Sequence, residues 1–122
     1  MTPTLSTIIL YARDMQRTAA FYQTFFGFVT TGTVVEGLIE LRAADHGADL
    51  LIHQAAKSVK LGQAAVKLMF DVADIEGFKK LSAERGLIFG SIHQANGYAF
   101  ANAKDPDGNS VAISSRAFRE NT

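Results

Sequence analysis

The chain has 122 residues, 48% of them hydrophobic, and its 12 lysines and arginines balance its 12 aspartates and glutamates. This size and composition predict one folded domain with a substantial core and exclude a disordered chain. The neutral charge balance gives no electrostatic support for a nucleic-acid or anionic-membrane partner. Because cysteine is absent, disulfides, thiolate catalysis and cysteine-ligated zinc are excluded, and three histidines must supply any nitrogen ligand.

The sequence gives no sign of a membrane span or an export signal. Residues 18–35 and 86–103 carry no charged side chain, but polar residues and glycines interrupt both stretches, so neither predicts a span. The N-terminus has no basic region followed by an apolar segment, so we expect no signal peptide. We therefore expect a cytoplasmic protein.

The first half of the chain predicts a strand, a helix and three further strands. Residues 4–12 are mostly β-favouring. Asp14 is typical of a helix N-cap and Gly27 of a helix stop, and apolar residues between them recur at mostly three- and four-residue steps, so the helix is expected at residues 15–26. The strands that follow are expected at residues 28–35, 37–43 and 48–54.

The second half repeats this order. A strand is expected at residues 64–72, and Asp74 and Gly86 delimit a second helix at residues 75–85. The pairs Asn96-Gly97 and Asp107-Gly108 are hairpin signals. They separate three more expected strands at residues 87–93, 97–103 and 109–115.

A nearly constant offset in residue number relates the two halves. An offset of 60 superimposes the first strand on the fifth and brings Thr7 onto Lys67. An offset of 61 superimposes the fourth strand on the last and brings Leu51 onto Ala112. The sequence therefore predicts one α+β domain over residues 1–122, made of two βαβββ modules at residues 1–57 and 63–122.

The third strand is less determined, because its offset could be either 60 or 61. Glu40 and Arg42 alternate there with Ile39 and Leu41, so the two charged side chains could face either solvent or a binding cleft.

Two stretches resemble the vicinal oxygen chelate superfamily, which includes glyoxalase I, bleomycin-resistance proteins, fosfomycin-resistance enzymes and extradiol dioxygenases. The first is residues 5–27, with Asp14, Phe21-Tyr22 and Phe25-Phe26-Gly27. The second is Phe100 and the run Asp105-Pro106-Asp107-Gly108-Asn109, followed by Val111 and Ile113. The resemblance covers essentially the whole chain. It implies a curled mixed sheet around a concave cleft, and a homodimer.

Strand alternation predicts which side chains face that cleft. Ile8 and Leu10 are expected to face the first helix, which leaves the odd-numbered residues of that strand to the cleft. The repeat gives the fifth strand the same orientation. The predicted substrate-binding residues are Thr7, Tyr11, His53, Lys67, Met69, Asp71, Phe100, Asn102 and Ser114.

The resemblance also implies a divalent metal held by His, Glu or Gln at four positions, which here are Thr7, Leu51, Lys67 and Ala112. Leucine and alanine side chains cannot coordinate, an ammonium has no lone pair, and threonine is a weak neutral oxygen. A slide by two positions in the fourth strand would bring His53 near this site. We predict neither metal nor cofactor.

Lys67 and Asp71 lie two steps apart on one strand face, so they could form a structural ion pair or a charge clamp for a ligand. We predict a metal-free small-molecule-binding protein of the glyoxalase/bleomycin-resistance type, which takes an amphipathic or anionic ligand. The alternative is a lyase, isomerase or dioxygenase-like enzyme with an atypical site, in which His53 and Lys67 supply acid–base groups. A third possibility is a degenerate member kept for protein interaction.

Overall fold

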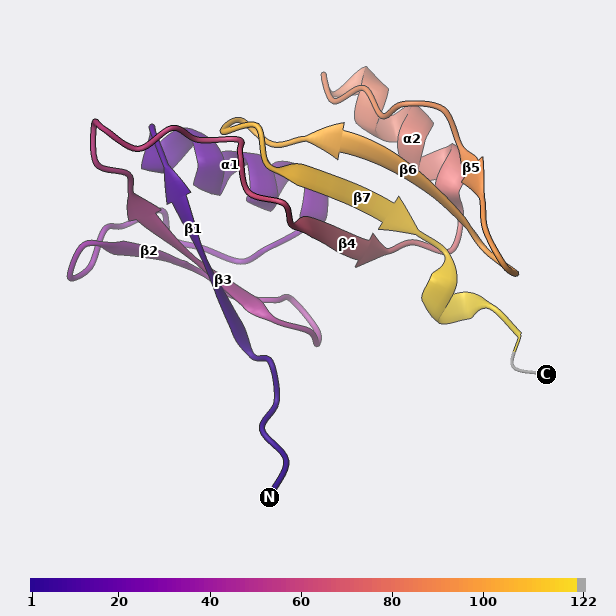
Figure 1. The fold of residues 1–122 in the computed structure, drawn as a ribbon, viewed down its shortest axis with the longest axis horizontal. Coiled ribbons are helices and arrows are strands. Elements are labelled where there is room, and N and C mark those ends of the chain that lie inside the picture. The colour runs from indigo at the N-terminus through magenta and orange to yellow at the C-terminus, as the bar shows by residue number, and fades with distance from the viewer. Residues whose placement is uncertain (121–122) are drawn as a thin grey trace. The chain divides into compact units, whose positions relative to one another are not determined.

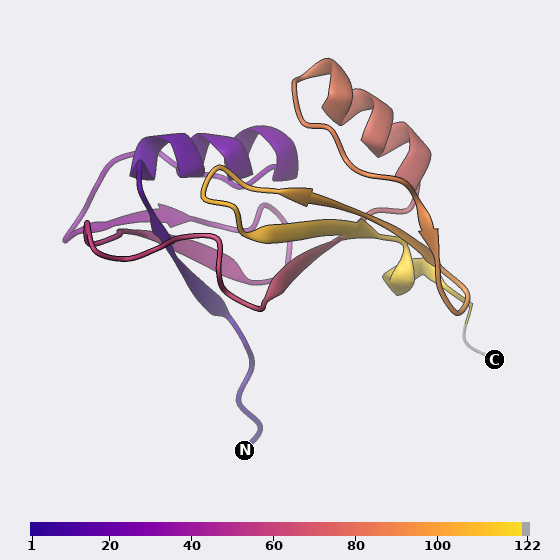
Figure 2. The same cartoon turned by 45° about the horizontal axis from the view of Figure 1, so that its top comes forward.

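The structure is a computed structural model that describes residues 1–120. The chain divides into two compact units, Met1–Leu61 and Gly62–Thr122. Each unit has one open sheet and one α-helix that contacts it (Figures 1 and 2). None of the described helices has the length and apolar character needed to cross a membrane.

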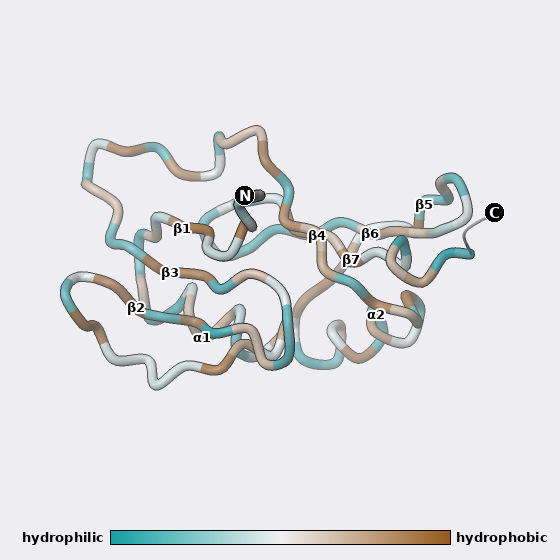
Figure 3. Tube along the Cα trace, turned by 90° about the horizontal axis from the view of Figure 1, so that it is seen from below, coloured by the Kyte–Doolittle hydropathy of each residue, from teal (hydrophilic) through white to brown (hydrophobic). Residues whose placement is uncertain are grey.

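The first unit contains a three-stranded mixed sheet in the order β1-β3-β2. Its elements are β1 (Thr7–Ala12), α1 (Met15–Phe26), β2 (Leu38–Leu41) and β3 (Asp49–Gln54). The central strand β3 pairs parallel with β1 and antiparallel with β2. Figure 3 shows hydrophobic stretches along β1 and β3. Burial alternates along both strands, so every second side chain is directed toward the core.

Helix α1 has the bounds that the sequence predicts, because both of its ends are capped. The Asp14 carboxylate accepts the N–H of Arg17 at 3.1 Å, and Gly27 ends the helix in the left-handed region at φ 72°. The helix buries Tyr22, which is fully enclosed together with Ile39 and Ile52 of the sheet. This packing fixes α1 on one face of the sheet and leaves the other face uncovered by it.

The second unit contains a four-stranded mixed sheet in the order β4-β7-β6-β5. Its elements are β4 (Lys67–Asp71), α2 (Ile75–Glu84), β5 (His93–Gln94), β6 (Ala99–Lys104), β7 (Ser110–Ser114) and the 3₁₀ turn η1 (Arg116–Phe118). The Asp74 carboxylate caps α2 by accepting the N–H of Gly77 at 3.0 Å. The core of this unit includes Phe89, Val111 and Ile113.

The strand register confirms the two offsets predicted for the first and fourth strands of each module. Thr7 lies opposite Asp49 in the first sheet, and Lys67 lies opposite Ser110 in the second. Thr7 and Lys67 differ by 60 in residue number, and Asp49 and Ser110 differ by 61.

The offset of 60 or 61 expected for the third strand is wrong. Leu38 pairs with His53, and its counterpart Phe100 pairs with Ser114, so the offset is 62. The cause is one extra residue in the first unit between equivalent pairs: eight residues separate the paired Leu41 and Leu50, whereas seven separate their counterparts Ala103 and Val111.

Residues 28–35 do not form the predicted strand. They make two isolated bridges, from Val29 to Arg42 and from Val35 to Leu38. Between the bridges, two threonine hydroxyls accept backbone N–H groups two residues further along the chain, and Gly32 has φ 73°. These local turns replace the hydrogen bonds that a strand would make with its neighbour.

The strand expected at residues 87–93 is also shorter than predicted. Leu87 and Phe89 are buried as alternation requires, but only His93–Gln94 is a strand. The N–H of Leu87 closes the end of α2 by bonding the Ser82 carbonyl, and Gly90 bonds the Asn102 carbonyl at 2.8 Å. The backbone N–H of Leu87 is therefore used to end α2, and regular strand pairing begins only at His93.

Candidate ligand-binding site

The face of the first sheet that α1 leaves uncovered, here called the first open face, carries mixed apolar and polar side chains. Ile9, Leu51 and Glu40 form one cross-strand row, and Tyr11, His53 and Leu38 form the next. Ile9 and Tyr11 are 50% and 51% exposed, a large fraction for apolar and aromatic side chains. This face therefore offers apolar surface to a ligand or a partner chain.

The structure brings two of the three predicted residues of this unit together. The rings of Tyr11 and His53 lie with their centroids 5.1 Å apart. Nδ1 of His53 lies 2.8 Å from the Gln54 carbonyl oxygen, which can accept a hydrogen bond from this nitrogen. Thr7 is exposed at the start of β1, two rows away opposite Asp49.

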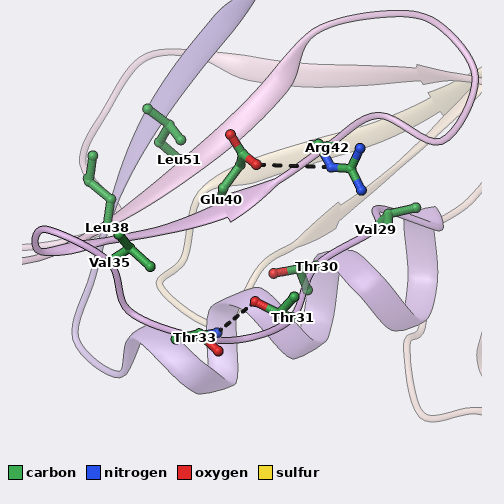
Figure 4. Close-up of a pocket in the computed structure, with 9 residues that line it drawn as sticks. All are labelled: Val29, Thr30, Thr31, Thr33, Val35, Leu38, Glu40, Arg42 and Leu51. Atoms are coloured by element: carbon green, nitrogen blue, oxygen red, sulfur yellow. Dashed lines mark hydrogen bonds and ion pairs between the residues drawn. The ribbon is translucent and has the colours of Figure 1, made fainter.

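A pocket of about 670 Å³ also opens on this face. Figure 4 shows Glu40 and Arg42 side by side, and the loop that carries Thr30, Thr31 and Thr33, here called the threonine loop, faces them across the pocket. The lining residues come from β2, β3, the segment before β2 and the residue directly after it: Val29, Thr30, Thr31, Thr33, Val35, Leu38, Glu40, Arg42 and Leu51. A volume of this size is in the range of small-molecule sites, roughly 300–1,000 Å³.

The second open face is the corresponding face of the sheet β4-β7-β6-β5. Lys67, Met69 and Asp71 of β4 are exposed, and Phe100 and Asn102 of β6 are half-buried. The Lys67 ammonium nitrogen lies 5.5 Å from the centroid of the Phe100 ring, and the His93 ring stacks on Phe100 at 5.2 Å. Met69 and Asn102 lie in one cross-strand row of the sheet, and Asp71 and Phe100 lie in the next row.

The alternatives left open for Lys67 and Asp71 are resolved in part. Among the residues that the structure describes, the ion pair is between Arg42 and Glu40, and Lys67 pairs with no carboxylate. Its positive charge is therefore free to meet an anion.

Two predicted polar residues of β6 and β7 differ in what they can offer a ligand. Ser114 is completely buried, and its hydroxyl oxygen accepts the N–H of Arg116 at 3.1 Å, so it stabilises the turn after β7. Asn102 is half-buried, and its Oδ1 has no hydrogen-bond partner among the described residues. Such a buried acceptor is costly until a donor reaches it.

The pocket residues Glu40 and Arg42 are absent from the predicted site set. Their strand alternation was visible in the sequence, but its register was not. The observed offset of 62 makes Glu40 the counterpart of Asn102 and Arg42 the counterpart of Lys104. The threonine loop gave no such signal, since residues 28–35 were expected to be a regular strand.

The family follows from the sequence match. The profile of the Glyoxalase/Bleomycin resistance protein/Dioxygenase superfamily matches residues 4–113. The chain belongs to this superfamily. The structure agrees, since two α+β units with open mixed sheets and one helix each form a glyoxalase-like fold. A search of curated proteins found no match.

Solved glyoxalase-like structures share this fold at low identity. Lactoylglutathione lyase from Agrobacterium tumefaciens is 20% identical with a TM-score of 0.71, over 93% of this chain and 94% of that one. UcmS2 is 15% identical with a TM-score of 0.78, over 94% and 99%. TnmS3, an antibiotic-binding protein from Streptomyces sp. CB03234, is 16% identical with a TM-score of 0.75, over 92% and 94%.

The four positions that correspond to the superfamily's metal ligands do not fit a divalent cation. Leu51 and Ala112 have no donor atom, Lys67 is positively charged, and Thr7 supplies one neutral oxygen. The register places Leu51 opposite Ile9, one row from Thr7, and His53 opposite Tyr11, two rows from Thr7. Within residues 1–120, no group of three or more His, Asp or Glu side chains is arranged to hold a metal.

Proposed function

We propose that this glyoxalase-like protein binds a small amphipathic organic anion on its second open face, without help from a metal ion. The observation that carries the proposal is the placement of the Lys67 ammonium 5.5 Å from the Phe100 ring centroid, with no carboxylate paired to it among the described residues. An anionic group can bond this ammonium while an apolar body packs on the surface beside it.

The surrounding side chains suit such a ligand. Met69 is 44% exposed, and its flexible thioether can adapt to an apolar body. The stacked His93 and Phe100 rings provide a flat surface, and the buried Oδ1 of Asn102 would gain from a ligand donor. The likeness to an antibiotic-binding protein supports binding as the role, as does the bleomycin-resistance branch of the superfamily.

The enzymatic alternative has weaker support. A metal-assisted lyase or dioxygenase reaction needs a ligand set, and Leu51, Lys67 and Ala112 cannot provide one. The likeness to a lactoylglutathione lyase, at 20% identity, concerns the fold. Binding uses the side chains present without further chemistry.

Homodimerisation and a cytoplasmic location are parts of the same proposal. Strand β1 is an edge of its sheet, and apolar surface is exposed by Ile9 within it and by Leu5 just before it. Edge strands with such surface favour pairing, so we expect a dimer that buries at least roughly 1,500 Å². Light scattering at tens of micromolar, an order-of-magnitude choice, should give twice the chain mass, and a monomer there would contradict the dimer. The lack of cysteine supports the location, which fractionation of cells would test.

Anilinonaphthalene sulfonate, an amphipathic anion, serves as a probe of the binding function. Protein treated with EDTA should bind it by calorimetric titration, and added salt should weaken binding because the contact with Lys67 is electrostatic. Binding that requires a divalent metal would contradict the proposal. So would about one tightly held metal per chain, found by elemental analysis and lost in His53→Ala.

A further inference from the structure

We propose that the pocket on the first open face is a ligand site, which selects neutral molecules with an apolar body and an adjacent hydrogen-bond donor and acceptor, such as a primary amide or a lactam. This site uses none of the residues assigned to the anion on the second open face. Its proposed selectivity rests on the paired charges of Glu40 and Arg42, together with the apolar walls around them.

The pocket has room for a molecule of one or two rings. Its volume is about 670 Å³, and four of its nine lining residues are aliphatic. Leu51 and Leu38 are half-buried in the sheet, whereas Val29 and Val35 are 45% and 63% exposed. An apolar body that covers these valines would remove surface from water that the chain now leaves exposed.

Glu40 and Arg42 give this pocket its polar edge. They lie two residues apart on the same face of the strand, and Nε of Arg42 is 4.0 Å from Oε1 of Glu40. The Arg42 and Glu40 side chains are 64% and 66% exposed. An ion pair with this long separation and this much exposure to solvent contributes little to the free energy of unfolding. Most of the donors of Arg42 and the second oxygen of Glu40 therefore remain available to a ligand.

A donor beside an acceptor matches this edge better than a single charge does. A carboxylate drawn to Arg42 meets repulsion from Glu40, and an ammonium drawn to Glu40 meets repulsion from Arg42. An amide offers its N–H to Glu40 and its carbonyl to Arg42. It also loses much less hydration on entering the pocket than a charged group loses.

The threonine loop supplies further donors opposite the charged edge. The hydroxyl oxygens of Thr30 and Thr31 accept the N–H groups of Gly32 and Thr33, at 3.0 Å and 3.3 Å (Figure 4 draws the second bond). Each hydroxyl hydrogen is thus left to donate. Gln16 of α1 holds the loop by donating from Nε2 to the Gly32 carbonyl at 2.9 Å.

Three probes with one apolar body and different head groups test the selectivity: naphthamide, naphthoate and naphthylmethylammonium. Each is titrated into isotope-labelled protein, and backbone amide shifts report where it binds. We expect naphthamide to move the amides of residues 29–42 and Leu51, with an affinity for this pocket about fivefold or more above that of the two charged probes, a difference of about 1 kcal/mol.

Charge-removing variants give the sharper result. Glu40→Gln should strengthen naphthoate binding in this pocket about fivefold, because it removes the like charge, and should change naphthamide binding little. The matched control Glu84→Gln, an exposed carboxylate at the end of α2, should change neither. Equal naphthoate affinity in the wild type and Glu40→Gln, or no naphthamide shifts at residues 29–42, would overturn the proposal.

The same spectra separate this site from the anion site. Naphthoate bound at the second open face moves the amides around Lys67 and Phe100, and Lys67→Ala should abolish those shifts alone. If naphthamide fills the pocket while naphthoate leaves Lys67 untouched, the anion-binding function fails and the amide site stands. The reverse pattern contradicts the amide site and supports anion binding.

Discussion

Replacing Asp105 with alanine should destabilise the second unit more than most single substitutions in the chain. Asp105 is 5% exposed at the start of the β6–β7 connection. Its Oδ1 accepts the N–H groups of Asp107 and Asn109, and its Oδ2 accepts the side-chain amide of Asn109, all at 2.9 Å. One carboxylate therefore organises the turn between the two strands that carry Asn102 and Ala112.

The size of the effect follows from these three bonds. A hydrogen bond to a charged group contributes about 1.5–3 kcal/mol, but the turn residues are half-buried, so water can replace part of what is lost. We expect Asp105→Ala to lower the free energy of unfolding by about 3 kcal/mol. Asp105→Asn should cost about 1–2 kcal/mol, because an amide oxygen can still accept both backbone N–H groups.

Urea unfolding followed by circular dichroism measures both variants. The midpoints should fall in the order wild type, Asp105→Asn, Asp105→Ala, with similar slopes. A loss below about 1 kcal/mol for Asp105→Ala, less than a single charged hydrogen bond, would refute the reasoning. Equal losses for the two variants would show that charge, and not the two backbone bonds, stabilises the turn.

Two further predictions concern the repeat. The substitutions Gly47→Ala and Gly108→Ala, at counterpart positions of the two halves, test the effect of steric crowding. Both glycines have a positive φ, so both substitutions strain the backbone. A Cβ at Gly47 meets open space, whereas a Cβ at Gly108 lies 3.2 Å from the Cα of Gly62. We expect a loss of about 1 kcal/mol for Gly47→Ala and at least about 2 kcal/mol for Gly108→Ala, and equal losses by urea unfolding would contradict this. Asp14→Ala and Asp74→Ala should each cost about 1 kcal/mol, because each removes a helix N-cap, and unchanged melting temperatures would contradict that expectation.

Much of the fold could be predicted because local signals and the repeat agree. The Asp14 cap and the Gly27 stop fixed the bounds of α1, and the two offsets between the halves gave the correct register of β1 with β3 and of β4 with β7. Each of these features depends on residues close in sequence or on a strict alternation of side chains. They could therefore be recognised without coordinates.

The parts that could not be predicted depend on local competition between hydrogen bonds. The threonine hydroxyls around Gly32 turn a β-favouring segment into a loop, and one extra residue between the paired positions of β2 and β3 shifts Glu40 by a register step. The pocket is lined by this loop and by Glu40, so the sequence did not predict its lining residues. The cation–π contact of Lys67 with Phe100 depends on side-chain reach across the sheet, although both residues were predicted for the site.

The most direct test of the central claim compares binding with folding in one variant. Lys67→Ala should lower the affinity for anilinonaphthalene sulfonate about tenfold, while urea unfolding shows a stability change below about 0.5 kcal/mol, as for an exposed side chain. Lys60→Ala, an exposed lysine in the connection before β4, is the matched control and should alter neither. Unchanged affinity in Lys67→Ala would contradict the account, as would a loss of affinity that only follows a loss of folding.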